Sequence, residues 1–192
     1  YFLMEKHLAR IRKSARYFGF RFTPSHAEKR LLALAGSFGD AEHRVRLLAA
    51  RNGSLRVEAA KLEQAAQPSP FRVGFARQPV DSRDRFLYHK TTNRRVYEEA
   101  RSARSDCDDV ILFNERDEVT ESTIANVVVE IAGRRLTPPV KCGLLAGVFR
   151  EHLIESGQVD EGVVTVDDFK RASGRFLVNS VRRWVPAVLM DG

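Results

Sequence analysis

A short segment with two prolines divides the chain into two parts with different patterns. Gln67, Pro68, Ser69 and Pro70 form this segment. Proline lacks the backbone N–H that a helix or strand interior needs, so two prolines in four positions are typical of a linker. We therefore predict an α/β (α+β) fold with a small N-terminal domain over residues 1–66, a linker over 67–70 and a larger C-terminal domain over 71–192.

Two amphipathic helices are predicted in the first part. Apolar residues recur every three or four positions over residues 5–18, and Gly19 is placed to end this helix. A second helix should begin near Pro24, where Ser25 and Glu28 have the spacing of a capping box.

Strands are predicted in both parts. In the first part, Asn52 and Gly53 predict a hairpin between residues 45–50 and 55–57. The strands expected after the linker are residues 71–76, 110–113, 124–131, 163–166, 176–179 and 185–189. Helices are expected after Lys90 and over residues 148–156.

The charge balance first suggests a nucleic-acid ligand. The 192 residues hold 32 Lys and Arg against 25 Asp and Glu, for a net charge of +7. The basic residues are scattered along the chain, which favours a solvated Arg-rich surface, with some of the excess serving an anionic small molecule. We therefore expect no nucleic-acid partner.

Other residue types exclude further classes of protein. Cys107 and Cys142 form no C-x-x-C pair and the five histidines have no ligand spacing, so neither a metal site nor a disulfide scaffold is expected. No apolar run approaches the ~20 residues that cross a bilayer. We expect a cytoplasmic protein without a membrane partner. The sequence begins without Met or a signal peptide, and we expect that it starts within a longer protein.

Three local features have a chemical interpretation beside an ordinary one. The loop from Gly143 to Gly147 leads into a helix, whose N-terminus can bind an anion, although a simple turn has the same sequence. Lys90 is either a solvated surface cation or a nucleophile that forms a Schiff base with a carbonyl. Glu121 is either an edge carboxylate or a partner for a protonated ring nitrogen.

In chain order, these features resemble the class IV aminotransferase family, the pyridoxal-phosphate enzymes of fold type IV. The similar blocks are residues 7–15 (HLARIRKSA), 88–94 (YHKTTNR), 114–126 (NERDEVTESTIAN), 137–139 (TPP), 143–150 (GLLAGVFR) and 178–182 (VNSVR). The resemblance implies that the larger domain is a pseudo-barrel that binds pyridoxal 5'-phosphate. It also implies a homodimer and further strands before residue 1.

The resemblance assigns roles to individual residues. Lys90 is implied to be the catalytic lysine that binds the cofactor covalently and moves the proton. The residues implied to hold the rest of the cofactor are Glu121 at the ring nitrogen, Leu145 on the ring face, and Arg10, Gly147, Val148, Phe149 and Ser180 at the phosphate. By their proximity to the motifs, Arg94 and Arg182 are the candidates for binding a dicarboxylate substrate.

Within the family, the blocks around Lys90 and Ser180 are most similar to aminodeoxychorismate lyase, in particular the lyase domain fused to aminodeoxychorismate synthase component I. This similarity implies cleavage of 4-amino-4-deoxychorismate to 4-aminobenzoate and pyruvate in folate biosynthesis. One alternative is an aminotransferase acting on branched-chain or D-amino acids, although branched-chain enzymes commonly have Tyr where Arg94 follows Asn93. A remote alternative is a cofactor-free module that binds nucleic acid or a protein partner.

Overall fold

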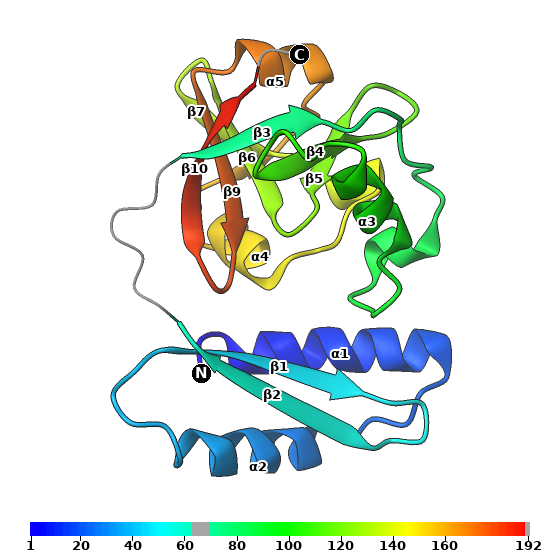
Figure 1. The fold of residues 1–192 in the computed structure, drawn as a ribbon, viewed down its shortest axis with the longest axis vertical. Coiled ribbons are helices and arrows are strands. Elements are labelled where there is room, and N and C mark those ends of the chain that lie inside the picture. The colour runs from blue at the N-terminus through cyan, green and yellow to red at the C-terminus, as the bar shows by residue number, and fades with distance from the viewer. Residues whose placement is uncertain (63–69, 191–192) are drawn as a thin grey trace. The chain divides into compact units, whose positions relative to one another are not determined.

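The computed structural model describes residues 1–62 and 70–190, which belong to two compact units, Tyr1–Ala66 and Gln67–Gly192 (Figure 1). Of the predicted linker 67–70, only Pro70 lies within the described residues. Among the described residues, no helix is long and apolar enough to span a membrane.

Over residues 1–62, the first unit contains two helices and a two-stranded antiparallel sheet. Its elements are α1 (Met4–Phe18), α2 (Pro24–Ala35), β1 (His43–Ala49) and β2 (Leu55–Lys61). Gly19 ends α1 in the left-handed conformation with φ of 69°, which glycine adopts without steric cost. The predicted hairpin is confirmed, since β1 and β2 pair from His43–Lys61 to Ala49–Leu55.

The predicted capping box at the start of α2 is wrong. The helix begins at Pro24 with Thr23 as its N-cap, and the Thr23 side chain makes no capping hydrogen bond. Ser25 therefore lies inside the first turn. Proline is favoured at the first helical position because its missing N–H would have no partner there.

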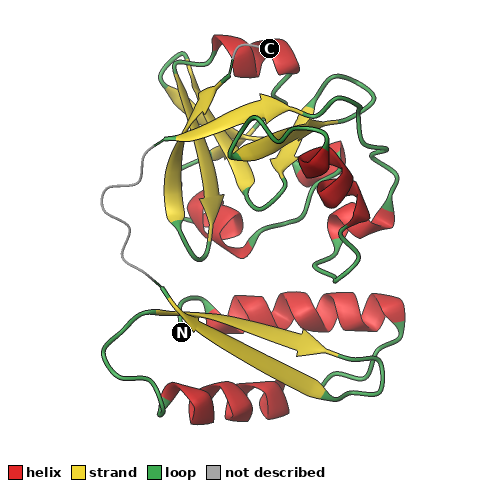
Figure 2. Ribbon diagram, in the orientation of Figure 1, coloured by secondary structure: helices red, strands yellow, loops and turns green. Residues whose placement is uncertain are grey.

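The second unit is built around a sheet that closes on itself (Figure 2). Its strands are β3 (Phe71–Phe75), β4 (Asp109–Phe113), β5 (Val119–Ser122), β6 (Asn126–Ile131), β7 (Arg134–Thr137), β8 (Asp160–Glu161), β9 (Gly174–Asn179) and β10 (Arg183–Leu189). The order is β5-β4-β3-β10-β9-β6-β7-β8, and a further pairing of β5 with β6 closes six strands into a barrel. The closing pair is Glu121 with Asn126.

Short helices accompany this barrel in the part of the second unit that the structure describes. They are the 3₁₀ helices η1 (Arg85–Tyr88) and η2 (Val140–Cys142), and the α-helices α3 (Arg95–Ser102), α4 (Val148–Glu155) and α5 (Val166–Arg171). The helices predicted after Lys90 and from residue 148 are confirmed.

Alternation of side chains separates the barrel interior from two outer clusters. Val127, Val129 and Leu177 point into the core inside the barrel, together with Phe169 of α5. On the outer side, one cluster packs Tyr97 of α3 and Leu87 of η1 against Val110 and Leu112 of β4. A second outer cluster packs Phe149 and Leu153 of α4 against Val128 and Val178.

The strand predicted over residues 163–166 is wrong. Val164 is buried in the core, but Thr165 makes only an isolated bridge with Glu118 and then caps α5. A reciprocal capping box joins Thr165 and Asp168. The same Thr-x-x-Asp spacing is visible in the sequence, where the neighbouring valines favoured a strand instead. The predictions also lacked β5, β7 and β8.

Candidate functional site

A β-bulge aims Glu121 out of the barrel. Ile111 pairs with Ser122 and Phe113 pairs with Val119, so three steps along β5 lie opposite two along β4. The extra residue changes the alternation of side chains. Val119 consequently lies in the barrel core, whereas Glu121 faces Tyr97 of α3.

The Glu121 carboxylate is buried and receives three hydrogen bonds. Its Oε1 accepts from Tyr97 Oη at 2.8 Å and from the Leu145 backbone N–H at 3.1 Å. Its Oε2 accepts from Asn126 Nδ2 at 3.4 Å, its one hydrogen-bond partner among the described residues. The side chain is therefore fixed by groups from α3, β6 and the loop before α4.

Burial raises the pKa of Glu121 to about 7 from an ordinary value of 4.5. The hydrogen bonds from Tyr97 and Leu145, and the charges of Lys90 and Arg94, act in the opposite direction. Burial and the adjacent Glu121 carboxylate raise the pKa of the Tyr97 hydroxyl, so it remains a hydrogen-bond donor. The site thus holds a carboxyl group that a ligand with a positive ring nitrogen would stabilise as an anion.

Asn126 connects Glu121 to the N-terminal end of α4. Its Nδ2 also donates to the Leu145 carbonyl at 2.8 Å. Its Oδ1 lies so close to Gly147 that a Cβ built there would meet it at 1.9 Å. Gly147 is the N-cap of α4, and the first N–H groups of a helix have no acceptor within the helix. The Asn126 side chain therefore lies between Glu121 and the predicted anion site at Gly147, Val148 and Phe149.

The turn between β9 and β10 lies on the same outer face of the barrel. Asn126 pairs with Val178, and Ser180 follows two residues later at a half-buried position. The guanidinium of Arg183 lies 5.6 Å from the Phe149 ring of α4, whereas Arg182 is exposed and lies 5.2 Å from the Phe71 ring. Ser180 is thus on the face that carries α4.

The loop that carries Lys90 is fixed to the turn between β4 and β5. Ser82 donates through its hydroxyl to Glu115 at 2.6 Å and through its backbone N–H to the same carboxylate at 3.0 Å. Tyr88 Oη donates to the Ser82 carbonyl at 2.5 Å. These contacts join the last residue of η1 to the segment before it and join that segment to Glu115, and Lys90 follows at an exposed position.

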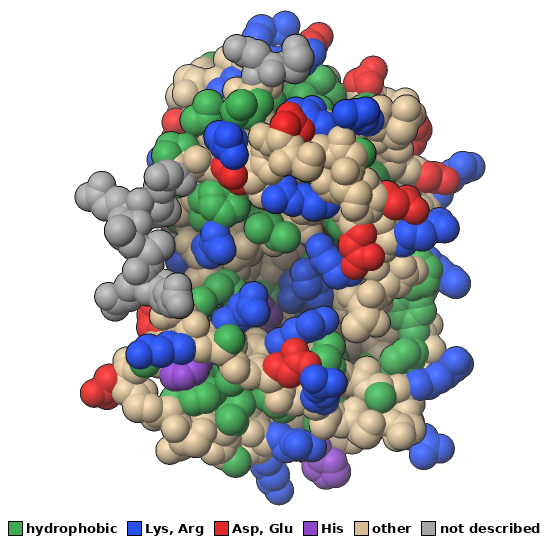
Figure 3. Space-filling model, in the orientation of Figure 1, with side chains coloured by type: hydrophobic (Ala, Val, Ile, Leu, Met, Phe, Trp, Pro, Cys, Tyr) green, Lys and Arg blue, Asp and Glu red, His purple; other side chains and the backbone are tan. Residues whose placement is uncertain are grey.

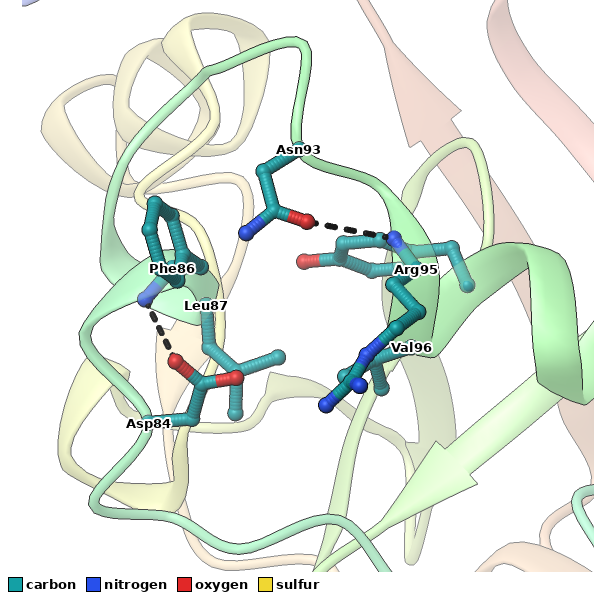
Figure 4. Close-up of a pocket in the computed structure, with 7 residues that line it drawn as sticks. Asp84, Phe86, Leu87, Asn93, Arg95 and Val96 are labelled. Atoms are coloured by element: carbon teal, nitrogen blue, oxygen red, sulfur yellow. Dashed lines mark hydrogen bonds between the residues drawn. The ribbon is translucent and has the colours of Figure 1, made fainter.

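A cavity of about 430 Å³ lies between η1 and the start of α3 (Figure 4). Its walls are Asp84, Phe86, Leu87, Asn93, Arg95, Val96 and Tyr97. Asp84 Oδ1 accepts from the Phe86 N–H at 2.9 Å, and Asn93 Oδ1 accepts from the Arg95 N–H at 3.5 Å. Tyr97 lines this cavity and also donates to Glu121, whereas neither Lys90 nor Glu121 is part of its wall.

Two predicted residues have contacts that bear on their assigned roles. Arg94 donates to the Thr123 carbonyl at 2.5 Å and its guanidinium lies 4.8 Å from the centre of the Tyr97 ring. Arg10 belongs to α1 of the first unit, where its Nη2 lies 3.5 Å from Nδ1 of His7. The assignment of Arg10 to the phosphate stays a prediction.

Tyr97 and Asn126 are the contributors to this site that received no role from the sequence. Asn126 gave a signal, because it interrupts an apolar run that continues to Ile131. Tyr97 looked like an ordinary core aromatic on a helix, and its contact with Glu121 depends on the bulge in β5. Among the described residues there is no group of three or more side chains arranged to bind a metal.

Basic side chains are distributed over both units on the face shown in Figure 3, with acidic and apolar groups between them. Many of the arginines have acidic neighbours, including Arg72 with Asp108 at 3.2 Å. This distribution agrees with the solvated Arg-rich surface expected from the sequence.

Comparison with known proteins places the chain among characterised folds. The family model for amino-transferase class IV matches residues 1–189. A candidate aminodeoxychorismate lyase from Schizosaccharomyces pombe is 31% identical over 198 residues, covering 98% of this chain and 84% of that protein. The crystal structure of a candidate amino-acid aminotransferase from Mesorhizobium loti is 37% identical with a TM-score of 0.89, covering 98% of this chain and 92% of that one.

A further solved structure shows the same fold at lower identity. It is an aminotransferase from Brucella abortus bound to pyridoxal phosphate, with 17% identity and a TM-score of 0.80, covering 97% of this chain and 75% of that one. The predicted α/β fold with a pseudo-barrel is therefore confirmed.

Replacing Gly147 with Ala tests the close approach of Asn126. We expect Gly147→Ala to lower the free energy of unfolding by about 2–3 kcal/mol, because Asn126 must move and give up hydrogen bonds inside the protein. Trp184, the one tryptophan of the chain, reports unfolding of the second unit by fluorescence. In the control Gly162→Ala, the new Cβ meets Leu136 at an ordinary 3.4 Å. Equal losses in the two variants would contradict the account.

Proposed function

The chain belongs to the class IV aminotransferases, a family of enzymes, and from that premise we propose that it is a pyridoxal-phosphate-dependent lyase that converts 4-amino-4-deoxychorismate to 4-aminobenzoate and pyruvate. One observation carries the cofactor site on which the proposal depends. The buried Glu121 carboxylate is linked through Asn126 to the N-terminal end of α4, and the charge of Lys90 acts on the same carboxylate.

The residues around Glu121 fit pyridoxal phosphate. Oε2 of Glu121 can accept a further hydrogen bond, which a protonated ring nitrogen would donate. The backbone N–H groups of Val148 and Phe149, with the Ser180 hydroxyl, suit a phosphate. The absence of a side chain at Gly147 lets the Asn126 side chain lie close to the start of α4. Leu145 is the apolar group proposed to cover the ring. When bound, the cofactor supplies an electron-poor ring that accepts the electron pair released at the amine-bearing carbon of the substrate.

Lys90 is proposed to be the catalytic residue. Its Nζ, as a neutral amine, takes the proton from the amine-bearing carbon of the substrate and then acts as a general acid. Glu121 stays in place as the anion that keeps the ring nitrogen protonated. Neither residue is consumed, so the roles of both are restored at the end of each turnover.

The proposed reaction balances without water or a second substrate. Lys90 takes the proton from the amine-bearing carbon, and the bond between the ring carbon and the ether oxygen breaks, so that the oxygen leaves with the enolpyruvyl group. The six-membered ring becomes aromatic, and the proton returns to the methylene carbon of the leaving enolpyruvate to give pyruvate. The substrate carries two carboxylates, for which guanidinium groups are suitable partners. We propose Arg94 and Arg182 for these contacts, and we retain the homodimer as a prediction.

The similar proteins divide between the lyase and an aminotransferase. The Schizosaccharomyces pombe relative is a candidate lyase, whereas the Mesorhizobium loti structure carries an aminotransferase name at 37% identity. We favour the lyase because Arg94 follows Asn93 in the block after Lys90. An aminotransferase is the second candidate, since it would need the same Lys90 and Glu121.

An activity assay separates the two reactions. We expect the purified protein with pyridoxal phosphate to release 4-aminobenzoate and pyruvate from 4-amino-4-deoxychorismate in the absence of any keto acid. The measurement is 4-aminobenzoate fluorescence, with amino transfer from branched-chain and D-amino acids to 2-oxoglutarate assayed in parallel. Amino transfer without release of 4-aminobenzoate would overturn the lyase in favour of the aminotransferase.

Lys90→Ala tests the attachment of the cofactor. Borohydride reduction of the wild-type protein should fix pyridoxal phosphate covalently on the peptide that contains Lys90, as seen by mass spectrometry. The variant should lose this modification and at least about a thousandfold in turnover, because it lacks both the nucleophile and the proton carrier. Lys170→Ala, which alters an exposed lysine beside Asp167 in α5, serves as the control. Labelling that persists in Lys90→Ala would refute the assignment.

A further inference from the structure

We infer that Tyr97, with the Arg94 guanidinium over its ring, is a positioning residue. Its hydroxyl completes the hydrogen bonding of one oxygen of Glu121, so that the other oxygen can bind the ligand. This inference rests on the proposed function, in which Glu121 binds a protonated ring nitrogen. It assigns a role to a hydroxyl group that the packing of α3 does not require.

The two oxygens of Glu121 have unequal partners. A carboxylate oxygen accepts about two hydrogen bonds. Oε1 already has two, from Tyr97 Oη at 2.8 Å and the Leu145 N–H at 3.1 Å. Oε2 has one long contact of 3.4 Å with Asn126 Nδ2, and the same nitrogen makes a shorter bond of 2.8 Å to the Leu145 carbonyl. Oε2 is therefore the atom with capacity for a further donor.

The hydroxyl of Tyr97 is separable from the packing of its ring. The ring belongs to the outer cluster with Leu87, Val110 and Leu112, where phenylalanine would fill the same volume. Tyr97 is the buried residue of α3, and its hydroxyl spans the distance from the helix to β5. The hydroxyl thus contributes a directed hydrogen bond in addition to apolar contact.

Arg94 supports Tyr97 from the start of the same helix. Its guanidinium lies 4.8 Å from the ring centre, within the range of a cation–π contact, and donates to the Thr123 carbonyl two residues beyond Glu121. The charged and titratable groups acting on Glu121 are Tyr97, Arg94 and Lys90, and Asp84 acts on Tyr97. Tyr97 thus binds the carboxylate itself, and Arg94 binds the backbone two residues further on.

The substitution Tyr97→Phe tests this role in protein without cofactor. The measurement is a carboxyl ¹³C NMR titration of glutamate-labelled protein, with the Glu121 signal assigned by its loss in Glu121→Gln. We expect the Glu121 midpoint to move to higher pH in Tyr97→Phe, because a donor that favours the anion is removed. The control Tyr88→Phe removes a hydroxyl from the nearby loop, where it binds the Ser82 carbonyl, and should leave the midpoint in place.

A second measurement concerns the cofactor itself. Tyr97→Phe should weaken pyridoxal phosphate binding about tenfold relative to the wild type, which corresponds to one lost hydrogen bond to a charged group. An unchanged midpoint in Tyr97→Phe, or an equal shift in Tyr88→Phe, would overturn the inference. The failure of the proposed function would look different. The wild-type protein would then bind no pyridoxal phosphate, although the Glu121 midpoint would still move in Tyr97→Phe.

Discussion

The carboxylate of Glu121 lies where the barrel closes, and its burial is the constraint on which the rest of the site depends. An ionised carboxyl costs several kcal/mol to remove from water unless hydrogen bonds compensate. Tyr97, Asn126 and the Leu145 N–H supply these bonds, yet burial still raises the pKa of Glu121 to about 7. The protein alone therefore does not fully stabilise the ionised form of Glu121.

Two of the donors to this carboxylate come from segments that are distant in sequence. Tyr97 belongs to α3 and Leu145 to the loop before α4, whereas Asn126 of β6 is the partner of Glu121 in the closing pair. Tyr97 and Leu145 therefore tie two further parts of the second unit to the closing pair of the barrel. The same Asn126 side chain lies against Gly147 at the N-cap of α4 and donates to the Leu145 carbonyl just before it, so the predicted phosphate site and the predicted ring-nitrogen partner share one support.

Local sequence signals predicted elements whose causes are local. Gly19 ends α1 in a left-handed conformation, and Gly147 begins α4, because these steps depend on only a few adjacent residues. The direction of Glu121 could not be predicted, since a bulge in β5 reverses the alternation that the sequence implies. Its contact with Tyr97 follows from that bulge, and the helix at Thr165 was missed because a valine-rich segment favoured a strand. Pairing across a closed sheet is a long-range property that one sequence does not display.

The most direct test is the pH dependence of stability in protein without cofactor, for the wild type and for Glu121→Gln. The folded-state pKa of Glu121 is raised to about 7 from 4.5, so the folded protein binds more protons between these values and loses stability as the pH rises through them. Glutamine does not titrate. Unfolding followed by Trp184 fluorescence at about pH 5 and about pH 8 should show the wild type losing about 1–3 kcal/mol relative to the variant. The account would be contradicted if the free energy of unfolding changed equally in the wild type and in Glu121→Gln between these two pH values.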